Sequence, residues 1–438
     1  MSTNNILRLV RWLSLAFLSL FLLACSRGVL SVEETEQDED PISEENTIPL
    51  LARSPSGEVT GISLSAEQKE WIDVSNRQAW NYLSFLRNGT ASSFLSPLSL
   101  NMALWMAASG ASGATADEIL AAAGLPGADP DALNEFSRKL LDYLPAADLS
   151  IGLRLNNLFV AESRLPVKKV YVDELAQAYY APAVNLDFSQ PDAVLSKIND
   201  WSSRNTEGLI PAILDRMDPF STAFLLNALY YKGLWVEPFT TLPDGRDFRC
   251  ADGSSAPVTM MKRTFQARYF QGTDFSAVAV PMGKRGCYEM DLFLPAEVDG
   301  LDALVSGMAD SQAAWLSGAG NSTVKLTLPV FSVTANHDCQ AMLQRLGMQQ
   351  AFTEEADFSG ITDVIGLRIT QVLQKARIRV DEFGTEAAAV SAVLVGATGR
   401  GPGEEEEIVE MTLDHPFVFS IRERATGLIL FCGCYTGR

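Results

Sequence analysis

Histidine, the side chain that most often acts as a general base, occurs only twice in this 438-residue chain. His337 stands in N-H-D, where a helix is expected to begin, and His415 stands in D-H-P-F. The chain has no G-x-S-x-G elbow, no H-E-x-x-H pair and no phosphate-binding loop that would give either histidine a catalytic partner. A zinc site would need more ligands than these two imidazoles. We therefore expect no catalytic residue, no metal and no cofactor, and we do not expect an enzyme.

Cysteine could supply a second kind of chemistry, but its spacing argues against a disulfide framework. Five cysteines follow Cys25, an odd number at wide intervals, namely Cys250, Cys287, Cys339, Cys432 and Cys434. Cys432 and Cys434 are two residues apart on a predicted strand, so they share a face without the geometry of a bridge. We interpret all five as small residues of the core or the surface.

The segment Asp381 to Val395, D-E-F-G-T-E-A-A-A-V-S-A-V-L-V, indicates instead a chain built to change conformation. Counted in twos, one face carries only small or β-branched residues, while Glu386 lies on the other face. That small face comprises Thr385, Ala387, Ala389, Ser391, Val393 and Val395. Such a face could slide between existing strands without clashing.

A glycine-rich run follows this small face directly, with Gly396, Gly399, Gly401, Pro402 and Gly403. This composition resists regular structure and is typical of an exposed loop tip that proteases can reach. An insertable strand and a cleavable loop are therefore adjacent in the sequence. The alternative interpretation is an edge strand followed by an ordinary glycine-rich surface loop.

Regular strands flank this segment on both sides. The residues from Lys375 to Asp381 alternate between apolar and charged side chains, which is the period of a half-buried strand, and Gly384 then interrupts the pattern. Beyond the loop, D-H-P-F-V-F-S-I-R at Asp414 to Arg422 and T-G-L-I-L-F-C-G at Thr426 to Gly433 have the pattern of a hairpin. A strand before the loop and a hairpin after it would hold both ends of the segment.

Several further motifs occur in an order that resembles the serpin family. The motif S-P-L-S-L at Ser96 to Leu100 resembles the start of the helix beneath the central serpin sheet, and Leu226 to Phe239 resembles its central strand. Asn199 to Gly208 resembles the end of the helix that crosses the sheet, and A-D-F-S-G-I at Ala356 to Ile361 resembles a further family segment. The likeness extends from about residue 66 to residue 438 and depends on the agreement of these motifs in order.

The resemblance implies an α+β fold, with a single serpin domain at residues 66–438. This domain would have a large central mixed β-sheet, smaller sheets, surrounding helices and an exposed reactive-centre loop at about residues 384–410. Length alone favours two or three domains, but no linker-like stretch interrupts residues 66–438. Helix starts are predicted by capping boxes at Ser65 with Gln68 and Thr115 with Glu118, and by Pro97 after Ser96.

The activity that the resemblance implies is inhibition of serine or cysteine endopeptidases by suicide-substrate trapping. The protease would attack a loop bond and form its acyl-enzyme, after which the segment from Thr385 would insert into the central sheet. The alternative is a non-inhibitory serpin, a surface binding or structural module whose loop is cleaved without trapping. The hinge implied by the family comprises Glu382, Gly384, Thr385, Glu386, Ala387, Ala388 and Ala389.

The position of the reactive bond stays open between two choices. Counting along the usual family loop from Gly384 gives Thr398–Gly399. The loop is several residues longer than usual, however, so Arg400–Gly401 is the alternative, and it would select trypsin-like enzymes.

The same resemblance implies that sheet opening is controlled by Ser96, Ser99, Asn227, Gln374 and Trp235. Gln374 stands where many serpins have a histidine, so its amide would have to make the hydrogen bonds to the segment containing Ser96, Ser99 and Asn227. Phe383 is bulkier and less polar than the charged residue usual before the hinge glycine. Both departures concern the ease of insertion and leave the predicted fold unchanged.

Residues 1–24 are predicted to be a lipoprotein signal peptide. Arg8 and Arg11 flank an apolar run, Trp12 to Leu23, that is too short to span a bilayer comfortably. The sequence L-L-A-C that ends at Cys25 resembles a bacterial lipobox, which implies lipidation of Cys25. The alternative is a simple secretory signal with an incidental cysteine. We expect an exported cell-envelope lipoprotein that is anchored to a bacterial membrane, with its domain outside the cytoplasm.

Residues 25–65 are predicted to form an acidic, flexible tether, because they combine few aromatic residues with many carboxylates. The net charge of −20 includes this tether, and the domain offers no basic stripe for nucleic acid. The predicted helix from Asp131 to Tyr143, where some serpins bind heparin, has only Arg138 and Lys139 as bases, so no glycosaminoglycan is expected. The expected partners are a target protease in a covalent acyl complex and the membrane, and the chain is expected to be a monomer.

Overall fold

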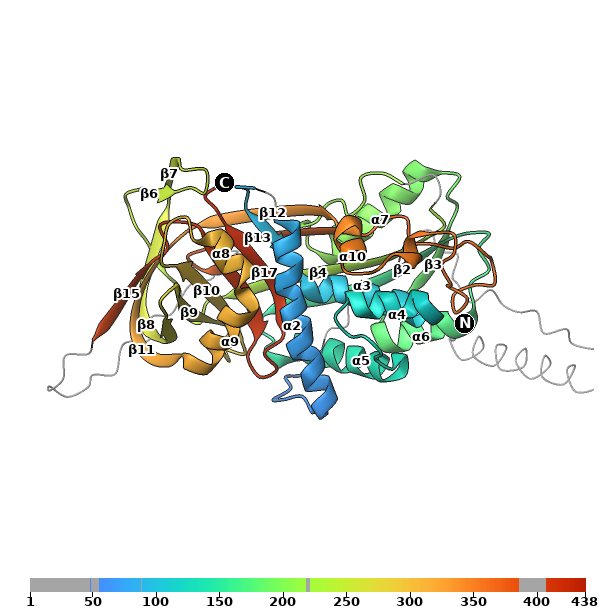
Figure 1. Ribbon diagram of the computed structural model, residues 1–438, viewed down its shortest axis with the longest axis horizontal. Helices are drawn as coiled ribbons and strands as arrows, with labels where there is room; N and C mark the ends of the chain where they lie inside the picture. The colour runs from blue at the N-terminus through green and yellow to red at the C-terminus, as the bar shows by residue number, and fades with distance from the viewer. Residues whose placement is uncertain (1–47, 49–54, 88, 218–220, 386–406) are drawn as a thin grey trace, which may run out of the picture. The chain divides into compact units, whose positions relative to one another are not determined.

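A computed structural model of the chain describes residues 48, 55–87, 89–217, 221–385 and 407–438, all within one compact unit, Pro41–Arg438 (Figure 1). Its helices are α2 Ala66–Leu86, α3 Pro97–Ser109, α4 Gly113–Ala122, α5 Pro130–Ala147, α6 Lys169–Tyr179, α7 Pro191–Asn205, α8 Leu301–Ser306, α9 Met308–Gly318 and α10 Gln340–Arg345. A short 3-10 helix covers Gln350–Phe352. No helix in these ranges is both long and apolar enough to cross a bilayer.

The strands form three sheets. They are β1 Ser93–Leu95, β2 Gly152–Glu162, β3 Ala183–Leu186, β4 Ala223–Leu234, β5 Thr240–Thr241, β6 Arg246–Arg249, β7 Ser255–Val258, β8 Met260–Gln271, β9 Phe275–Met282, β10 Tyr288–Pro295, β11 Gly320–Pro329, β12 Phe331–Asp338, β13 Leu373–Asp381, β14 Gly384–Thr385, β15 Ile408–Thr412, β16 Phe417–Glu423 and β17 Ile429–Tyr435. The first sheet has the order β12-β13-β14-β4-β2-β3, the second has the order β1-β17-β16-β10-β9-β8-β11-β15 with β5 beside β8, and β6 pairs with β7. Parallel and antiparallel pairs occur in both large sheets, as the predicted mixed α+β fold requires.

Strand β4 of the six-stranded sheet is covered on both faces, whereas β12 and β13 expose alternate residues along part of their length. Along β4, Leu229 and Tyr231 belong to the main hydrophobic core, whereas Phe224, Leu226 and Ala228 belong to a second core that includes Trp201 of α7. Successive strand residues point to opposite faces, so α3 and α7 cover the two sides. Burial on both faces explains why β4 has an almost continuous apolar sequence.

The helix beneath this sheet, α3, begins as the sequence predicts. Ser96 is the N-cap, its hydroxyl accepts a hydrogen bond from Ser99 N, and Pro97 is the first helical residue. The capping box of Ser65 and Gln68 at α2 is also present. The predicted hairpin after the loop is the antiparallel pair β16 and β17. These elements therefore place the candidate site as the sequence suggests.

The capping box predicted at Thr115 and Glu118 is wrong. Helix α4 begins two residues earlier, at Gly113, and both side chains serve a distant segment instead. Thr115 Oγ1 accepts from Asp357 N, and Glu118 Oε2 accepts from the backbone N–H groups of Gln349 and Gln350. The local S/T-x-x-E pattern could not reveal this role, because the partner segment lies more than two hundred residues away in the chain.

Part of the predicted tether contacts the folded domain. Ile48 is 1% exposed and lies in the second core, and Arg204 Nη2 donates to its carbonyl. Val59 N donates to Ala146 O, and Glu58 lies 3.8 Å from Arg285. An isolated isoleucine in an acidic stretch gave no periodic signal, so the sequence reasoning did not predict that it would be buried.

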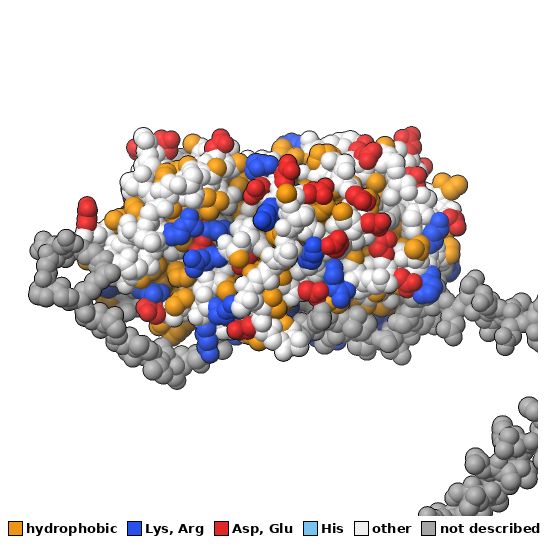
Figure 2. All heavy atoms as spheres, turned by 90° about the horizontal axis from the view of Figure 1, so that it is seen from below, with side chains coloured by type: hydrophobic (Ala, Val, Ile, Leu, Met, Phe, Trp, Pro, Cys, Tyr) orange, Lys and Arg blue, Asp and Glu red, His pale blue; other side chains and the backbone are white. Residues whose placement is uncertain are grey.

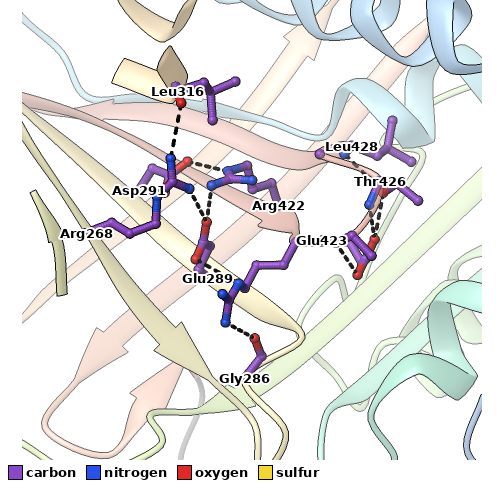
Figure 3. A network of polar contacts seen from close by, with 12 residues as sticks. Arg268, Gly286, Glu289, Asp291, Leu316, Arg422, Glu423, Thr426 and Leu428 are labelled. Atoms are coloured by element: carbon purple, nitrogen blue, oxygen red, sulfur yellow. Dashed lines mark hydrogen bonds and ion pairs between the residues drawn. The ribbon is translucent and has the colours of Figure 1, made fainter. Parts of the chain in front are cut away.

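A buried ionic cluster lies on the nine-stranded sheet (Figure 3). Arg422 of β16 donates from Nε to Asp291 Oδ2 at 2.6 Å and from Nη2 to Glu289, both on β10. Arg268 and Arg424 each lie 3.7 Å from Glu289. Burial, together with the neighbouring Asp291 carboxylate, raises the pKa of Glu289, and Arg422 opposes this shift. The two carboxylates therefore depend on one buried guanidinium.

We expect Arg422→Met to lower the free energy of unfolding by about 3–5 kcal/mol, because it leaves two buried carboxylates without their main counter-charge. Arg424→Met is the matched control: the Arg424 side chain is 53% exposed, and its loss should change stability by less than about 0.5 kcal/mol. Guanidinium unfolding of both variants measures the difference. Equal stability losses would show that the cluster does not depend on Arg422.

Candidate functional site

The strand β14 enters the six-stranded sheet between β13 and β4. The chain leaves β13 at Asp381, turns over two residues and pairs again at Gly384 and Thr385. Thr385 lies opposite Val380 on β13 and opposite Gly233 on β4, antiparallel to both. Within the part of the chain that the structure describes, β14 is the sheet neighbour that joins these two strands. The segment singled out in the sequence therefore begins inside the sheet.

The backbone around the turn is tied to the segment that follows β4. Trp235 N donates to Phe383 O at 2.9 Å, Phe239 N donates to Glu382 O at 2.8 Å, and Trp235 Nε1 donates to Asp381 O at 2.9 Å. Thr385 is only 2% exposed, and its hydroxyl accepts from Gly233 N at 2.9 Å. These bonds fix the position and the register of β14 between its two neighbours.

Gly384 is required by close backbone approach. Its φ is +148°, and a Cβ at this position would lie 2.1 Å from Gly233 O. No other residue type fits this conformation and this distance without moving β4. The sequence predicted Gly384 as an interruption of the strand pattern and, by the family resemblance, as a hinge residue, and the structure makes it the first residue of β14.

Two cavities follow the line between β4 and β13, below Thr385. The upper cavity has a volume of about 20 Å³ and is lined by Leu229, Tyr231, Ala376, Ile378 and Thr385 among others. The lower cavity has a volume of about 100 Å³. Its walls are the first residues of β4, residues 367–374 and the α3 side chains Leu100, Ala103, Leu104 and Ala107. Unfilled space between β4 and β13, which we call the slot, therefore continues the line of β14.

Four of the five residues predicted to control sheet opening lie together beside the lower cavity, namely Ser96, Ser99, Asn227 and Gln374. Ser99 Oγ donates to Asn227 Oδ1, and Gln374 Nε2 donates to Ser96 O at 2.5 Å. The hydrogen bond predicted between Gln374 and the Ser96 segment is therefore present, while its role in opening stays a prediction. Trp235 lies elsewhere, with the hinge. The sequence reasoning missed Asn157 on β2, whose Oδ1 accepts from Asn227 Nδ2 at 2.6 Å.

Only the nitrogen of the Gln374 side-chain amide has a hydrogen-bond partner. It is 5% exposed, and its Oε1 has no hydrogen-bond partner among the described residues. Gln371 Oε1, three residues earlier in the chain, also has no hydrogen-bond partner among the described residues. A buried amide oxygen without a donor is unfavourable by about 1–3 kcal/mol. Both glutamines border the lower cavity.

Both histidines have structural roles. His337 lies on β12 opposite Gln374, which corrects the predicted helix start, and its Nε2 is 3.1 Å from Phe94 O. Burial lowers the pKa of His337. His415 is bonded at both nitrogens, to Asp414 Oδ1 at 2.8 Å and to Pro295 O at 3.0 Å. Neither ring is placed to activate a nucleophile.

We expect the sheet to lose stability as the pH falls below about 6.5, the ordinary pKa of histidine. The folded pKa of His337 is lowered, so the unfolded chain binds its proton first and acid favours unfolding. Guanidinium midpoints at pH 7.5 and 5.5 should therefore differ more in the parent than in His337→Gln, whose amide can still donate to Phe94 O. An identical pH dependence in the two proteins would remove His337 as the cause.

The five described cysteines are all free, and four of them are buried. Burial raises the pKa of Cys339 to about 12, and it raises the pKa values of Cys432 and Cys434 as well. Thiols in this state are poor nucleophiles and poor metal ligands. No group of three or more His, Cys, Asp or Glu side chains in the described ranges is arranged to hold a metal ion.

The remaining predicted site residues lie outside the described part of the chain. They are the reactive-bond candidates Thr398, Gly399, Arg400 and Gly401, the hinge residues Glu386, Ala387, Ala388 and Ala389, and Cys25. Further along the chain, Ile408–Thr412 form β15, parallel to β11 at the edge of the nine-stranded sheet. Residues 386–406 therefore connect one large sheet to the other.

Comparison with known proteins gives one consistent result. Residues 74–436 match the family model described as Serpin (serine protease inhibitor). An uncharacterized serpin-like protein of Thermococcus kodakarensis is 31% identical over 371 residues, covering 84% of this chain and 85% of the relative. Serpin-ZXA of Oryza sativa subsp. japonica is 32% identical over 357 residues, covering 77% and 88%.

Solved structures agree in fold. Tengpin, a thermophilic serpin in its native state, has a TM-score of 0.76 at 24% identity and covers 88% of this chain and 97% of its own. Human thyroxine-binding globulin in complex with thyroxine also has a TM-score of 0.76 at 24% identity and covers 84% and 98%. At this identity the likeness shows the fold alone.

Proposed function

The chain belongs to the serpin family, and from this premise we propose that it inhibits serine or cysteine endopeptidases as a suicide substrate. Members of this family are generally protease inhibitors rather than enzymes. The two histidines of the chain are engaged in structural hydrogen bonds, which agrees with an inhibitor. The target protease would supply all the catalytic groups.

The observation that carries the proposal is the position of β14. Its two residues already pair with β13 on one side and β4 on the other, at the head of a slot with hollow space beneath it. The sequence that continues from Thr385 has small side chains on the same face. A segment so placed needs only to be released at its far end to continue as a strand.

Release would come from the protease itself. Attack on the reactive bond forms an acyl-enzyme and separates the two ends of the loop. The segment from Thr385 could then insert and carry the bound protease along the sheet before water hydrolyses the ester or thioester. The chain would contribute no general base or oxyanion hole. It contributes the position of the scissile bond and the free energy released by forming the strand.

The position of the reactive bond determines how many loop residues remain between the inserted strand and the bound protease. A strand that reaches Val395 leaves three residues before Thr398–Gly399 and five before Arg400–Gly401. Each extra residue adds up to about 3.3–3.6 Å of chain. The shorter tether transmits more force to the protease, so we propose Thr398–Gly399, with Arg400–Gly401 as the alternative that would favour trypsin-like enzymes.

The competing proposal is a non-inhibitory serpin whose loop is cleaved without insertion. Thyroxine-binding globulin, one of the structural neighbours, is described as binding thyroxine, so the fold also occurs with ligand binding. The hinge sequence argues for inhibition here, because Thr385, Ala387 and Ala389 lack the bulk and charge that would obstruct insertion. Gly384 and Thr385 already fit the slot.

The decisive experiment is to mix the protein with a panel of serine and cysteine endopeptidases and to look for a complex that survives boiling in detergent. A trapped protease gives a band at the summed mass minus the fragment released from the loop. Mass spectrometry of that fragment identifies the cleaved bond. Clean cleavage by every protease with full recovery of protease activity would reject inhibition and favour the non-inhibitory alternative.

We further propose that the protein acts at the cell envelope as a monomer, through lipidation of Cys25. The support is the lipobox-like sequence, and this segment lies outside the described residues. Incorporation of labelled palmitate into the parent and its absence from Cys25→Ser would support the anchor, whereas equal labelling would reject it.

Both signs of charge occur on the face shown in Figure 2. Arg138 pairs with Asp142, and Lys139 pairs with Glu135. We therefore expect no glycosaminoglycan or nucleic-acid partner.

A further inference from the structure

The lower cavity, between β4 and residues 367–374, has about the size of a single aromatic ring. Its volume is about 100 Å³, and an engineered protein cavity of about 150 Å³ with apolar walls binds benzene. Leu104 of α3, Phe159 of β2 and Phe224 of β4 are buried side chains of its wall, as are Phe358 and Ile361. Burial against these side chains would favour an apolar molecule of this size.

The serine, asparagine and threonine side chains in the wall of the lower cavity already have partners. Ser99 Oγ donates to Asn227 Oδ1, and Asn227 Nδ2 donates to Asn157 Oδ1. Thr370 Oγ1 lies 3.1 Å from Ser221 Oγ. These groups satisfy one another and leave little polar capacity for a ligand.

The two glutamines of the wall differ, because each has an amide oxygen without a donor among the described residues. Gln374 is 5% exposed, and its Nε2 donates to Ser96 O. This bond fixes the orientation of the amide, since a reversed amide would place Oε1 against the carbonyl of Ser96. The unpaired oxygens of Gln374 and Gln371 are both acceptors, so a ligand must donate a proton to satisfy them.

The wall also restricts the charge of a ligand. Among the described residues that line the lower cavity, Arg368 is the one that carries a charge, and its guanidinium lies 3.6 Å from Glu354. A cation would be repelled by Arg368 and would lose its hydration without a carboxylate partner in the wall. A carboxylate or a phenolate has no proton to donate to an amide oxygen. A neutral hydroxyl group avoids both penalties.

We propose that the lower cavity binds a small neutral phenol, with the ring against the apolar wall and the hydroxyl donating to Gln374 Oε1. The proposal goes beyond protease inhibition, because it concerns the uncleaved molecule and requires neither a protease nor insertion of the loop. The bound molecule would contact both β4 and residues 367–374. By mass action it would stabilise the arrangement of the sheet that binds it.

Phenol and toluene are the matched test ligands, because they have the same number of non-hydrogen atoms and only phenol can donate. Their dissociation constants are measured with the uncleaved full chain by ligand-observed NMR. A hydrogen bond to a buried acceptor that otherwise stays unpaired contributes about a factor of ten in affinity. The ratio of the toluene to the phenol dissociation constant should therefore fall about ten-fold in Gln374→Met, whose side chain is similar in length and lacks the amide. Both ligands are compared in the same variant, so a change in its stability cancels from this ratio.

Ala103→Leu tests the location of the site. Ala103 lines the lower cavity from α3, so a leucine side chain there would occupy space that the ring needs. This variant should lose the binding of both ligands. Ala121→Leu is the matched control, because Ala121 is an exposed residue of α4, and this variant should bind phenol as the parent does.

Any of three results would overturn the proposal: no saturable binding of phenol to the parent, an unchanged ratio in Gln374→Met, or phenol binding that persists in Ala103→Leu. Each measurement is made without a protease, so a failure here would leave the proposed inhibition intact. A failure of inhibition would equally leave the binding result intact. The two proposals therefore stand or fall on different data.

Discussion

Thr385→Arg is expected to convert the protein from an inhibitor into a substrate. Thr385 is buried at the head of the slot, with its hydroxyl bonded to Gly233 N, and a guanidinium there would have to enter the sheet without a counter-charge. An uncompensated buried charge costs several kcal/mol, and each 1.4 kcal/mol is a factor of ten in rate. Insertion should therefore slow more than about 100-fold. The acyl-enzyme would then be hydrolysed before the strand inserts, and the protease would be released.

The measurement is the amount of detergent-stable complex per cleaved inhibitor molecule. Thr385→Arg should show normal cleavage and almost no complex. Ala388→Arg is the matched control, because it adds the same side chain three residues later on the opposite face of the predicted strand, where Glu386 already has a charge. This control should still trap protease. Loss of trapping in both variants would mean that any added charge in the loop prevents trapping, whichever face of the strand carries it.

The fold could be predicted from sequence where local signals and chain order agree. The alternation before the loop became β13, the two apolar runs after it became β16 and β17, and the N-cap of α3 appeared at Ser96. Such features depend on neighbours a few residues apart, and sequence periodicity reports these contacts directly. The resemblance to serpins then supplied the topology, which periodicity alone could not.

The parts that the sequence left open depend on contacts between distant residues. Asn157 completes the polar cluster with Asn227, but an asparagine inside a strand has no distinctive pattern. The fit of Gly384 against Gly233 required knowing that the two backbones meet. The buried carboxylates Glu289 and Asp291 lie on a strand that is buried on both faces, and no local pattern indicates that Arg422 pairs with them. Each case joins elements far apart in the chain.

The uncleaved molecule keeps unpaired polar atoms and unfilled space between β4 and β13. Gln374 and Gln371 each leave a buried oxygen unpaired, and the two cavities leave apolar walls without full packing. Both features disfavour the present arrangement relative to one in which a strand fills the slot. If the proposed insertion occurs, the same residues should therefore make the cleaved molecule more stable than the uncleaved one.

Cleavage within residues 396–406 should accordingly raise the melting temperature rather than lower it. About ten inserted residues at a net gain of roughly 1 kcal/mol each would stabilise the molecule by on the order of 10 kcal/mol. For a domain of this size, that corresponds to a rise of about 13 °C. Most proteins become less stable when a loop is cut, so the sign of the change is diagnostic.

Calorimetry before and after digestion with a glutamate-specific endopeptidase measures this change without any target protease, in a Glu386→Gln background that leaves Glu404 to Glu407 as the cleavage sites of the loop. Ala387→Arg, cut in the same way, should show little or no rise, because its side chain would face the narrow upper cavity of about 20 Å³. If the cut parent melts at the temperature of the intact protein, strand insertion does not occur. The fold would then serve a binding role, since the energy needed to disable a trapped protease would be missing.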